Sequence, residues 1–280
     1  MNSVIQGPAS LPELPRLQRA RGVGRIVVAA DAGRTRLARL YQDGCGKIRL
    51  PRDARAEGLE AVLINSSGGL TGGDYMEWMA TVGDGARLTL STQACEKVYR
   101  ARDGQAQQRV ALILGENARL DWVPQETILF DGGALSRRLE ADLAEGARLL
   151  CVEAVVLGRT AMDETVRQGS IRDHWRIRRE GRLVFADDLR LDGAVAEIAA
   201  AAPVLAGGKA FASLLLVDDD AARFLKPLRV ALGAYGGASA FEGKLFARIV
   251  APDGFALREA LLPALEVLRD GEPLPRVWRT

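Results

Sequence analysis

The side chains that carry out most protein chemistry are scarce in this chain. Its one histidine is His174, and its three cysteines, Cys45, Cys95 and Cys151, lie far apart. Nucleophilic catalysis by serine or cysteine needs a histidine as base, and no Gly-x-Ser-x-Gly elbow is present. A tight transition-metal site usually needs several imidazole or thiolate ligands. What remains is carboxylate and carbonyl oxygen, which hold a divalent cation loosely, so we expect no closed metal site.

A glycine-rich segment, residues 65–74, is the first of two conspicuous motifs. It reads Asn-Ser-Ser-Gly-Gly-Leu-Thr-Gly-Gly-Asp, with four glycines in six residues. Glycine takes positive φ freely, so the segment predicts a tight bend. A phosphate-binding loop needs Gly-Lys-Ser/Thr before a helix, and neither Gly208-Lys209 nor Gly243-Lys244 completes that pattern. Nucleotide binding is therefore not expected.

The second motif, residues 92–100, reads Thr-Gln-Ala-Cys-Glu-Lys-Val-Tyr-Arg and predicts a polar strand. Together the two motifs resemble the signature of the UreD-type urease accessory proteins. The likeness continues through Leu-Asp-Trp-Val-Pro-Gln-Glu-Thr-Ile at 120–128, Gly-Arg-Thr-Ala-Met at 158–162 and Leu-Pro-Arg-Val-Trp at 274–278. The signature residues of the predicted strand are Gln93, Lys97, Tyr99 and Arg100.

The resemblance implies both a fold and a function. The fold would be mainly β, with a superhelical or open-barrel body of many strands and two α-helices near the C-terminal end. The protein would be a non-catalytic urease maturation factor that binds apo-urease and the F-type accessory protein, which recruits the G-type GTPase. In this family nickel is proposed to travel through a water-filled tunnel towards apo-urease. We therefore expect transient nickel and no tightly bound cofactor.

Carboxylates would line such a nickel path, and five acids are candidates. Asp187, for example, follows the apolar run Leu-Val-Phe-Ala, which indicates an inward or rim position. The alternative for each is an ordinary turn or surface acid, and Glu96 could instead form a cross-strand ion pair with Lys97. The five candidates are Asp74, Glu96, Glu126, Glu164 and Asp187.

The last residues are candidates for a partner interface. Exposed tryptophan and arginine side chains often anchor contacts between proteins, and the chain ends with Arg276 and Trp278 close together, after an apolar helix. For Trp278, docking of the terminus onto the core is the alternative.

Two other functions remain open. One is a β-solenoid or β-sandwich enzyme acting on carbohydrate, with Glu96 and Glu126 as acid and base. The aromatic content of 5% and the absence of clustered tryptophans argue against it. The other is a structural scaffold of a different complex.

Composition bounds the class of protein. Hydrophobic residues make up 48% and charged residues 26%, as in soluble globular proteins. The net charge of +2 predicts neither nucleic-acid nor membrane binding. No signal peptide is recognisable, no apolar run is long enough for a membrane helix, and the scattered cysteines favour reduced thiols. We expect a cytoplasmic protein, with residues 1–22 as a flexible lead-in and 23–280 as one domain.

Alternating apolar residues predict strands up to about residue 190. Three copies of a Gly/Asn-Ala-Arg-Leu motif begin at Gly85, Asn117 and Gly146, at spacings of 32 and 29 residues. This period predicts stacked β-hairpins or β-coils, with a shared turn type as the alternative. The expected strands are 24–30, 35–41, 58–64, 75–82, 107–114 and 147–157.

Later elements are less uniform. Helical spacing predicts a helix over 218–232, with a kink or break at Pro227, and one over 253–269 capped by Asp253. The sequence predicts a strand over residues 241–250. A strand around His174 would place that histidine on a face with three arginines, solvated or paired with acid.

Overall fold

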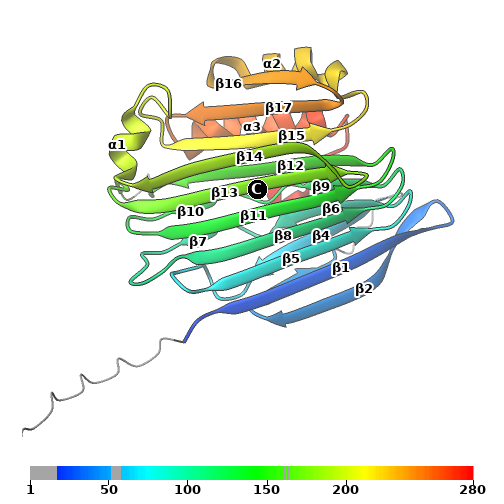
Figure 1. Cartoon of the computed structure of the whole chain (residues 1–280), viewed down its shortest axis with the longest axis horizontal. Coiled ribbons are helices and arrows are strands. Elements are labelled where there is room, and N and C mark those ends of the chain that lie inside the picture. Colours follow the sequence, from blue (N-terminus) through cyan, green and yellow to red (C-terminus); the bar gives the residue numbers. More distant parts are fainter. Residues whose placement is uncertain (1–17, 52–57, 160–161, 163, 280) are drawn as a thin grey trace, which may run out of the picture.

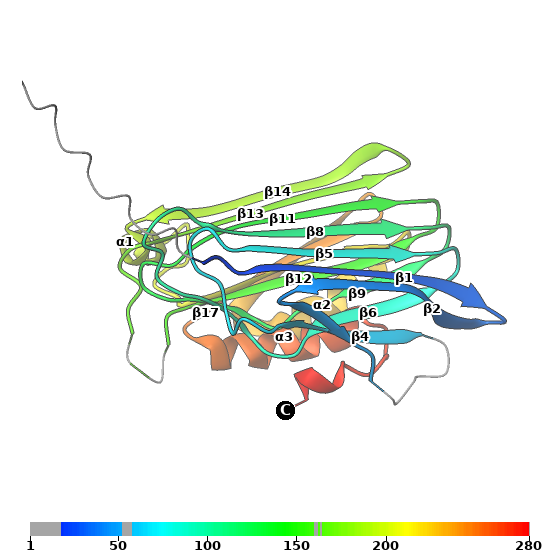
Figure 2. The ribbon, with the colours of Figure 1, turned by 90° about the horizontal axis from the view of Figure 1, so that it is seen from below.

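Two β-sheets stacked face to face form the body of the molecule, shown in Figure 1. The computed structural model describes residues 18–51, 58–159, 162 and 164–279. A 7-stranded sheet lies over a 10-stranded sheet, and helices cover the outer face of the latter (Figure 2). Within the described ranges no helix is long and apolar enough to cross a membrane.

The 7-stranded sheet has a parallel centre flanked by antiparallel edge strands. In spatial order its strands are β14 (Arg182–Gly193), β13 (Gly169–Arg179), β11 (Ala134–Leu143), β8 (Ala106–Leu114), β5 (Tyr75–Val82), β1 (Arg21–Asp31) and β2 (Arg34–Gly44).

The 10-stranded sheet has a parallel centre as well. Its main path is β16 (Gly236–Phe241), β17 (Lys244–Ala251), β15 (Ala210–Val217), β12 (Arg148–Leu157), β9 (Arg119–Trp122), β6 (Arg87–Thr92), β4 (Leu59–Asn65) and β3 (Gly46–Arg49), while β10 (Thr127–Leu129) and β7 (Glu96–Val98) pair beside β12.

The three sequence repeats stack in register. Strands β6, β9 and β12 are parallel neighbours, with Arg87 opposite Arg119 and Arg119 opposite Arg148. The first motif position has positive φ in each copy, at 66°, 53° and 66°, so the position requires glycine or asparagine. Each coil therefore crosses from one sheet to the other through the same turn, and the predicted β-coils are confirmed.

Two apolar layers hold the structure together. Inward-facing residues of both sheets, joined by the first of the three helices, form the first, and the second lies between the outer face of the 10-stranded sheet and the other two helices. The helices are α1 (Val195–Ala200), α2 (Leu225–Leu232) and α3 (Gly254–Leu268), with short 3-10 turns η2 (Ala221–Phe224), η3 (Gly233–Tyr235) and η4 (Arg276–Trp278).

The expected fold class is confirmed, including two helices near the C-terminal end. All six expected strands coincide with strands of the structure within a few residues, and the side chain of Asp253 caps α3 by accepting from Ala256 N at 2.9 Å. The break expected at Pro227 is wrong. Pro227 lies in the first turn of α2, where a backbone N–H has no helical partner to lose.

Smaller differences lie near the ends. The expected strand 241–250 is β17 together with the last residue of β16, separated by a turn. The alanine-rich stretch after residue 194 contains α1. Strand β1 starts at Arg21, within the expected lead-in, of which residues 1–17 lie outside the described residues.

Candidate functional site

A row of polar side chains interrupts the apolar inner face of the 7-stranded sheet. Gln108 of β8 is the register partner of Arg137 of β11, which is in turn the partner of Asp173 of β13. Exposed fractions of these residues are 9%, 1% and 7%. Parallel neighbours in register share a face, so the three form one continuous polar row inside the protein.

A second polar row faces it from the 10-stranded sheet. Glu153 of β12 is 3% exposed, and Thr127 of β10 is the register partner of Glu96 of β7. Together the six side chains form what we call the polar layer: Gln108, Arg137, Asp173, Glu153, Thr127 and Glu96.

Arg137 is the centre of the polar layer. Its Nη2 and Nε donate to the two carboxylate oxygens of Asp173, at 2.6 and 3.2 Å. Its Nη1 forms an ion pair with Glu153 and donates to Thr127 Oγ1 at 3.3 Å. Trp122 and Trp175 complete the network, since each indole N–H donates to one of the two carboxylates, at 2.9 and 3.2 Å.

A cavity of about 160 Å³ reaches this network. Its lining includes the exposed residues Gly68 and Gln93 as well as the buried Arg137 and Glu153. The cavity therefore leads from the surface beside the two sequence motifs into the polar layer between the sheets.

Two carboxylates along the cavity titrate near neutral pH. Burial raises the pKa of Glu96 to about 7, although the amide of Asn65 donates to it and opposes the rise. Burial likewise raises the pKa of Glu153 to about 7, against the favourable charge of Arg137. Burial therefore favours the protonated form of both carboxylates, and a nearby positive charge would favour the ionised form.

The two sequence motifs pack against each other at the cavity entrance. Leu70 N donates to Lys97 O at 2.7 Å, and Tyr99 N donates to Leu70 O at 2.8 Å. A Cβ on Gly69 would lie 2.4 Å from the Tyr99 ring, so only glycine allows this approach. The expected polar strand is shorter than the motif, because only residues 96–98 form β7 and residues 93–94 bend.

The signature residues mostly face outward. Gln93, Lys97, Tyr99 and Arg100 are exposed. Tyr99 packs edge-on against Phe130 with ring centroids 5.1 Å apart, and Arg100 pairs with Asp131 at 2.6 Å. The side chains of Tyr99 and Arg100 therefore lie at the end of the molecule where loops connect the coils, which we call the loop end.

Glu96 and Glu126 lie on opposite faces of their sheet. Glu96 belongs to the inner polar layer, where Asn65 rather than Lys97 is its partner. Glu126 pairs with Arg258 of α3 at 2.7 Å on the outer face, and Cys95 donates to it at 3.4 Å. Burial raises the pKa of the Cys95 thiol to about 11. Two carboxylates on opposite faces cannot flank one glycosidic bond.

The other three acids lie away from the polar layer. Asp74 accepts from the backbone of Ala20 and Thr71, both at 2.8 Å, and so closes the glycine-rich bend. Glu164 pairs with Arg159 at the loop end; residues 160 and 161 of that motif lie outside the described residues. Asp187 occupies a rim position, where it joins β14 to Arg248 of β17 at 2.7 Å.

The C-terminal tryptophan is not exposed, so the premise of its interface role is wrong. Trp278 is 2% exposed; its indole N–H donates to Val123 O at 2.9 Å and Arg258 lies over its ring. The tail docks onto the outer apolar layer, as the alternative held. Arg276 is exposed, and its interface role stays a prediction.

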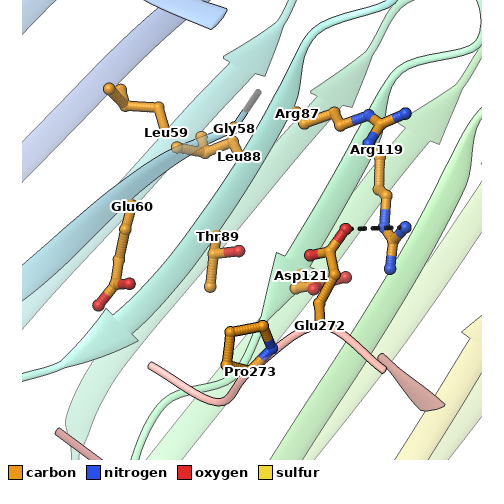
Figure 3. A pocket seen from close by; sticks show the side chains of 10 residues that line it. All are labelled: Gly58, Leu59, Glu60, Arg87, Leu88, Thr89, Arg119, Asp121, Glu272 and Pro273. Carbon is orange, nitrogen blue, oxygen red and sulfur yellow. Dashed lines mark ion pairs between the residues drawn. The ribbon is translucent and has the colours of Figure 1, made fainter. Parts of the chain in front are cut away.

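A second hollow, of about 230 Å³, lies on the outer face next to the loop after α3 (Figure 3). Arg119 pairs there with Glu272 at 3.1 Å and donates to the carbonyl of Arg269 at 3.0 Å. Arg148 donates to the carbonyl of Leu268, and Asp121 pairs with the buried Arg269. Cations at a helix C-terminus are stabilising, so these contacts fasten the end of α3.

Metal-ligating side chains do not form a closed shell in the described part of the chain, where no group of three or more His, Cys, Asp or Glu could hold an ion. His174 is on the arginine-bearing face expected for it and pairs with Asp188 at 2.5 Å. What the polar layer offers is oxygen: carboxylates, an amide and a hydroxyl.

Of the six residues of the polar layer, Glu96 is the one that the sequence analysis predicted as a site residue. A usable signal existed for Glu153, which interrupts the otherwise apolar run of β12. A carboxylate at an inward position of a buried strand requires a partner. The sequence does not identify that partner as Arg137.

The fold and the site define a class of protein: a β-solenoid whose apolar interior is interrupted by a buried polar layer that a surface cavity reaches. The model of the UreD urease accessory protein family matches residues 20–279. The UreD urease accessory protein of Agrobacterium fabrum is 54% identical over 263 residues, covering 94% of this chain and 92% of that protein. Those of Rhizobium leguminosarum bv. viciae and Mesorhizobium japonicum are 52% and 49% identical, each covering 94% of this chain and 96% and 95% of the relative. The chain belongs to the UreD family of urease accessory proteins.

Proposed function

We propose that this protein is a non-catalytic scaffold and nickel conduit in urease maturation. It binds apo-urease and the F-type accessory protein, and through the latter the G-type GTPase, in the cytoplasm. Nickel is its transient cargo and no cofactor is tightly bound. The family membership supports the urease partner, and the polar layer supports the conduit.

The observation that carries the conduit is the cavity between exposed Gln93 and buried Glu153. Nickel favours imidazole or thiolate for tight binding, and the cavity offers mainly oxygen. An ion passing Glu96 and Glu153 would exchange between weak sites and not be trapped. Of the five acids expected on the path, Glu96 is retained in this proposal, and Glu153 is added.

A co-expression experiment tests the proposal. Tagged chain would be produced with the matching urease subunits and the F- and G-type proteins, as wild type, Glu96→Gln, Glu153→Gln and the exposed control Glu266→Gln. We expect all four to retain urease and the F-type protein, while the two cavity variants yield urease with less nickel per active site. Normal nickel content of urease with both cavity variants would reject this path. Failure of the wild-type chain to retain either urease or the F-type protein would reject the scaffold.

A further inference from the structure

Arg137 lies between two buried carboxylates, those of Asp173 and Glu153. It holds Asp173 through two donors, Nη2 and Nε, but Glu153 through Nη1 alone. Arginine stays charged in proteins, and Arg137 is 1% exposed. The polar layer thus already contains one cation, supplied by the chain itself.

The charges around Arg137 do not balance within the described residues of the layer. One guanidinium faces Asp173 and Glu153, which leaves one negative charge when both are ionised, and Glu96 adds another along the cavity. Buried charge without compensation is costly. The polar layer therefore favours a second cation, or a proton in its place.

Gln108 supplies an independent sign of a missing ligand. Its Oε1 is buried and has no hydrogen-bond partner among the described residues, although the residue is 9% exposed and lines the cavity. Its register neighbour is Arg137. A buried acceptor without a donor is rare, and an amide oxygen that lines the same cavity as Glu96 and Glu153 is a suitable ligand for a divalent cation.

We propose that Arg137 is an internal counter-cation that closes the cation path at Glu153 and that a divalent metal ion must displace it from Glu153 to pass. This inference rests on the proposed function and adds its control step. The unequal contacts give the mechanism: Arg137 keeps both bonds to Asp173 and releases only its single contact with Glu153. The freed carboxylate and Gln108 Oε1 then bind the metal ion, with water completing its shell.

Nickel titration of the full chain by calorimetry at pH 7.5 tests this step. The variants are Arg137→Met, Arg137→Met with Glu153→Gln, and Arg138→Met, whose exposed arginine is the next residue of the same strand. We expect Arg137→Met to bind nickel about tenfold more tightly than wild type, because the competing charge is gone. The double variant should return to wild-type affinity and Arg138→Met should not differ from it. A folded Arg137→Met with wild-type affinity, or a gain that survives Glu153→Gln, would overturn the proposal.

A second variant covers the case in which Arg137→Met does not fold. Arg137→Lys keeps the positive charge but loses the two hydrogen bonds to Asp173. Nickel should therefore displace the lysine side chain from Glu153 at a concentration about threefold lower than in wild type. The readout is quenching of tryptophan fluorescence, since Trp122 donates to Glu153, and only quenching that Glu153→Gln abolishes is counted. Equal midpoints in wild type and Arg137→Lys would contradict the proposal.

Failure of this inference differs from failure of the conduit. If Glu153→Gln lowers the nickel content of urease while the Arg137 variants leave nickel affinity unchanged, the conduit stands and the gate is rejected. If Glu153→Gln alone leaves that content normal, the gate at Glu153 is rejected. If both Glu96→Gln and Glu153→Gln leave it normal, the conduit through this cavity is rejected, and the gate with it.

Discussion

The side-chain amide of Asn65 lies 3.1 and 3.2 Å from the two carboxylate oxygens of Glu96. Asn65 ends β4 at the start of the glycine-rich segment, and Glu96 begins β7 in the second motif. The same amide reaches the carbonyl of Gly69 at 3.2 Å. One amide therefore joins the two motifs and fixes a carboxylate on the inner face, at the cavity.

Glu96 should make stability depend on pH. Its pKa is raised from 4.5 to about 7 in the folded protein, so between these values the folded state binds more protons than the unfolded state. Stability from this group is then present at low pH and is lost as the pH rises from about 4.5 to about 7. Glu96→Gln removes this pH dependence. We therefore expect the free energy of unfolding of the variant, relative to that of wild type, to rise by about 2 kcal/mol from pH 5 to pH 8.

Chemical denaturation at both pH values measures this difference. Glu153 titrates in wild type and variant alike, so its contribution cancels. The exposed Glu266→Gln serves as the control and should follow wild type at both pH values. A constant difference between Glu96→Gln and wild type would show that Glu96 does not titrate in this range.

Arg137 and Arg138 are neighbours on β11 that face opposite sides of the sheet. Arg137→Ala leaves Asp173 and Glu153 without their buried partner, and we expect it to lower the free energy of unfolding by at least about 3 kcal/mol. Arg138→Ala changes an exposed side chain and should stay within about 0.5 kcal/mol of wild type. Urea unfolding of both variants checks the contrast, and similar losses would contradict a central role for the buried network.

Gly68 and Gly69 distinguish backbone strain from steric contact. Both have positive φ, at 82° and 151°, but a Cβ at position 68 meets no atom within 4 Å, whereas at 69 it meets the Tyr99 ring and Lys97 O. Gly68→Ala should cost about 1 kcal/mol of stability and Gly69→Ala clearly more. Thermal unfolding measures both, and equal losses would mean that the motif contact is not tight in solution.

Trp278 should matter for folding more than for recognition. Trp278→Ala removes a buried ring and its bond to Val123 O, and we expect a loss of about 3 kcal/mol or more. Arg276→Glu reverses an exposed charge, and we expect it to weaken retention of the partner proteins in a pull-down. Retention equal to that of wild type would reject the interface role of Arg276. A Trp278→Ala protein as stable as wild type would show that the tail is not docked.

Local sequence was sufficient for the elements whose determinants are local. The repeat beginning at Gly85, Asn117 and Gly146 predicted the coils because each copy needs a left-handed turn residue followed by an alternating strand. Asp253 predicted the start of α3 because a cap acts within one turn. Pro227 misled because its effect depends on its position in the helix, which begins at Leu225 and not at residue 218.

The β-coil architecture, the C-terminal helix and the family could be predicted from the amino-acid sequence, because they follow from periodicity, turn residues and contiguous motifs. The position of Arg137 between Glu153 and Asp173, and the placement of Glu96 and Glu126 on opposite faces, could be learned from the folded structure alone. Such contacts join residues from different strands and different sheets. Strand register and sheet stacking set them through the packing of the whole core, so no local pattern encodes which buried charges meet.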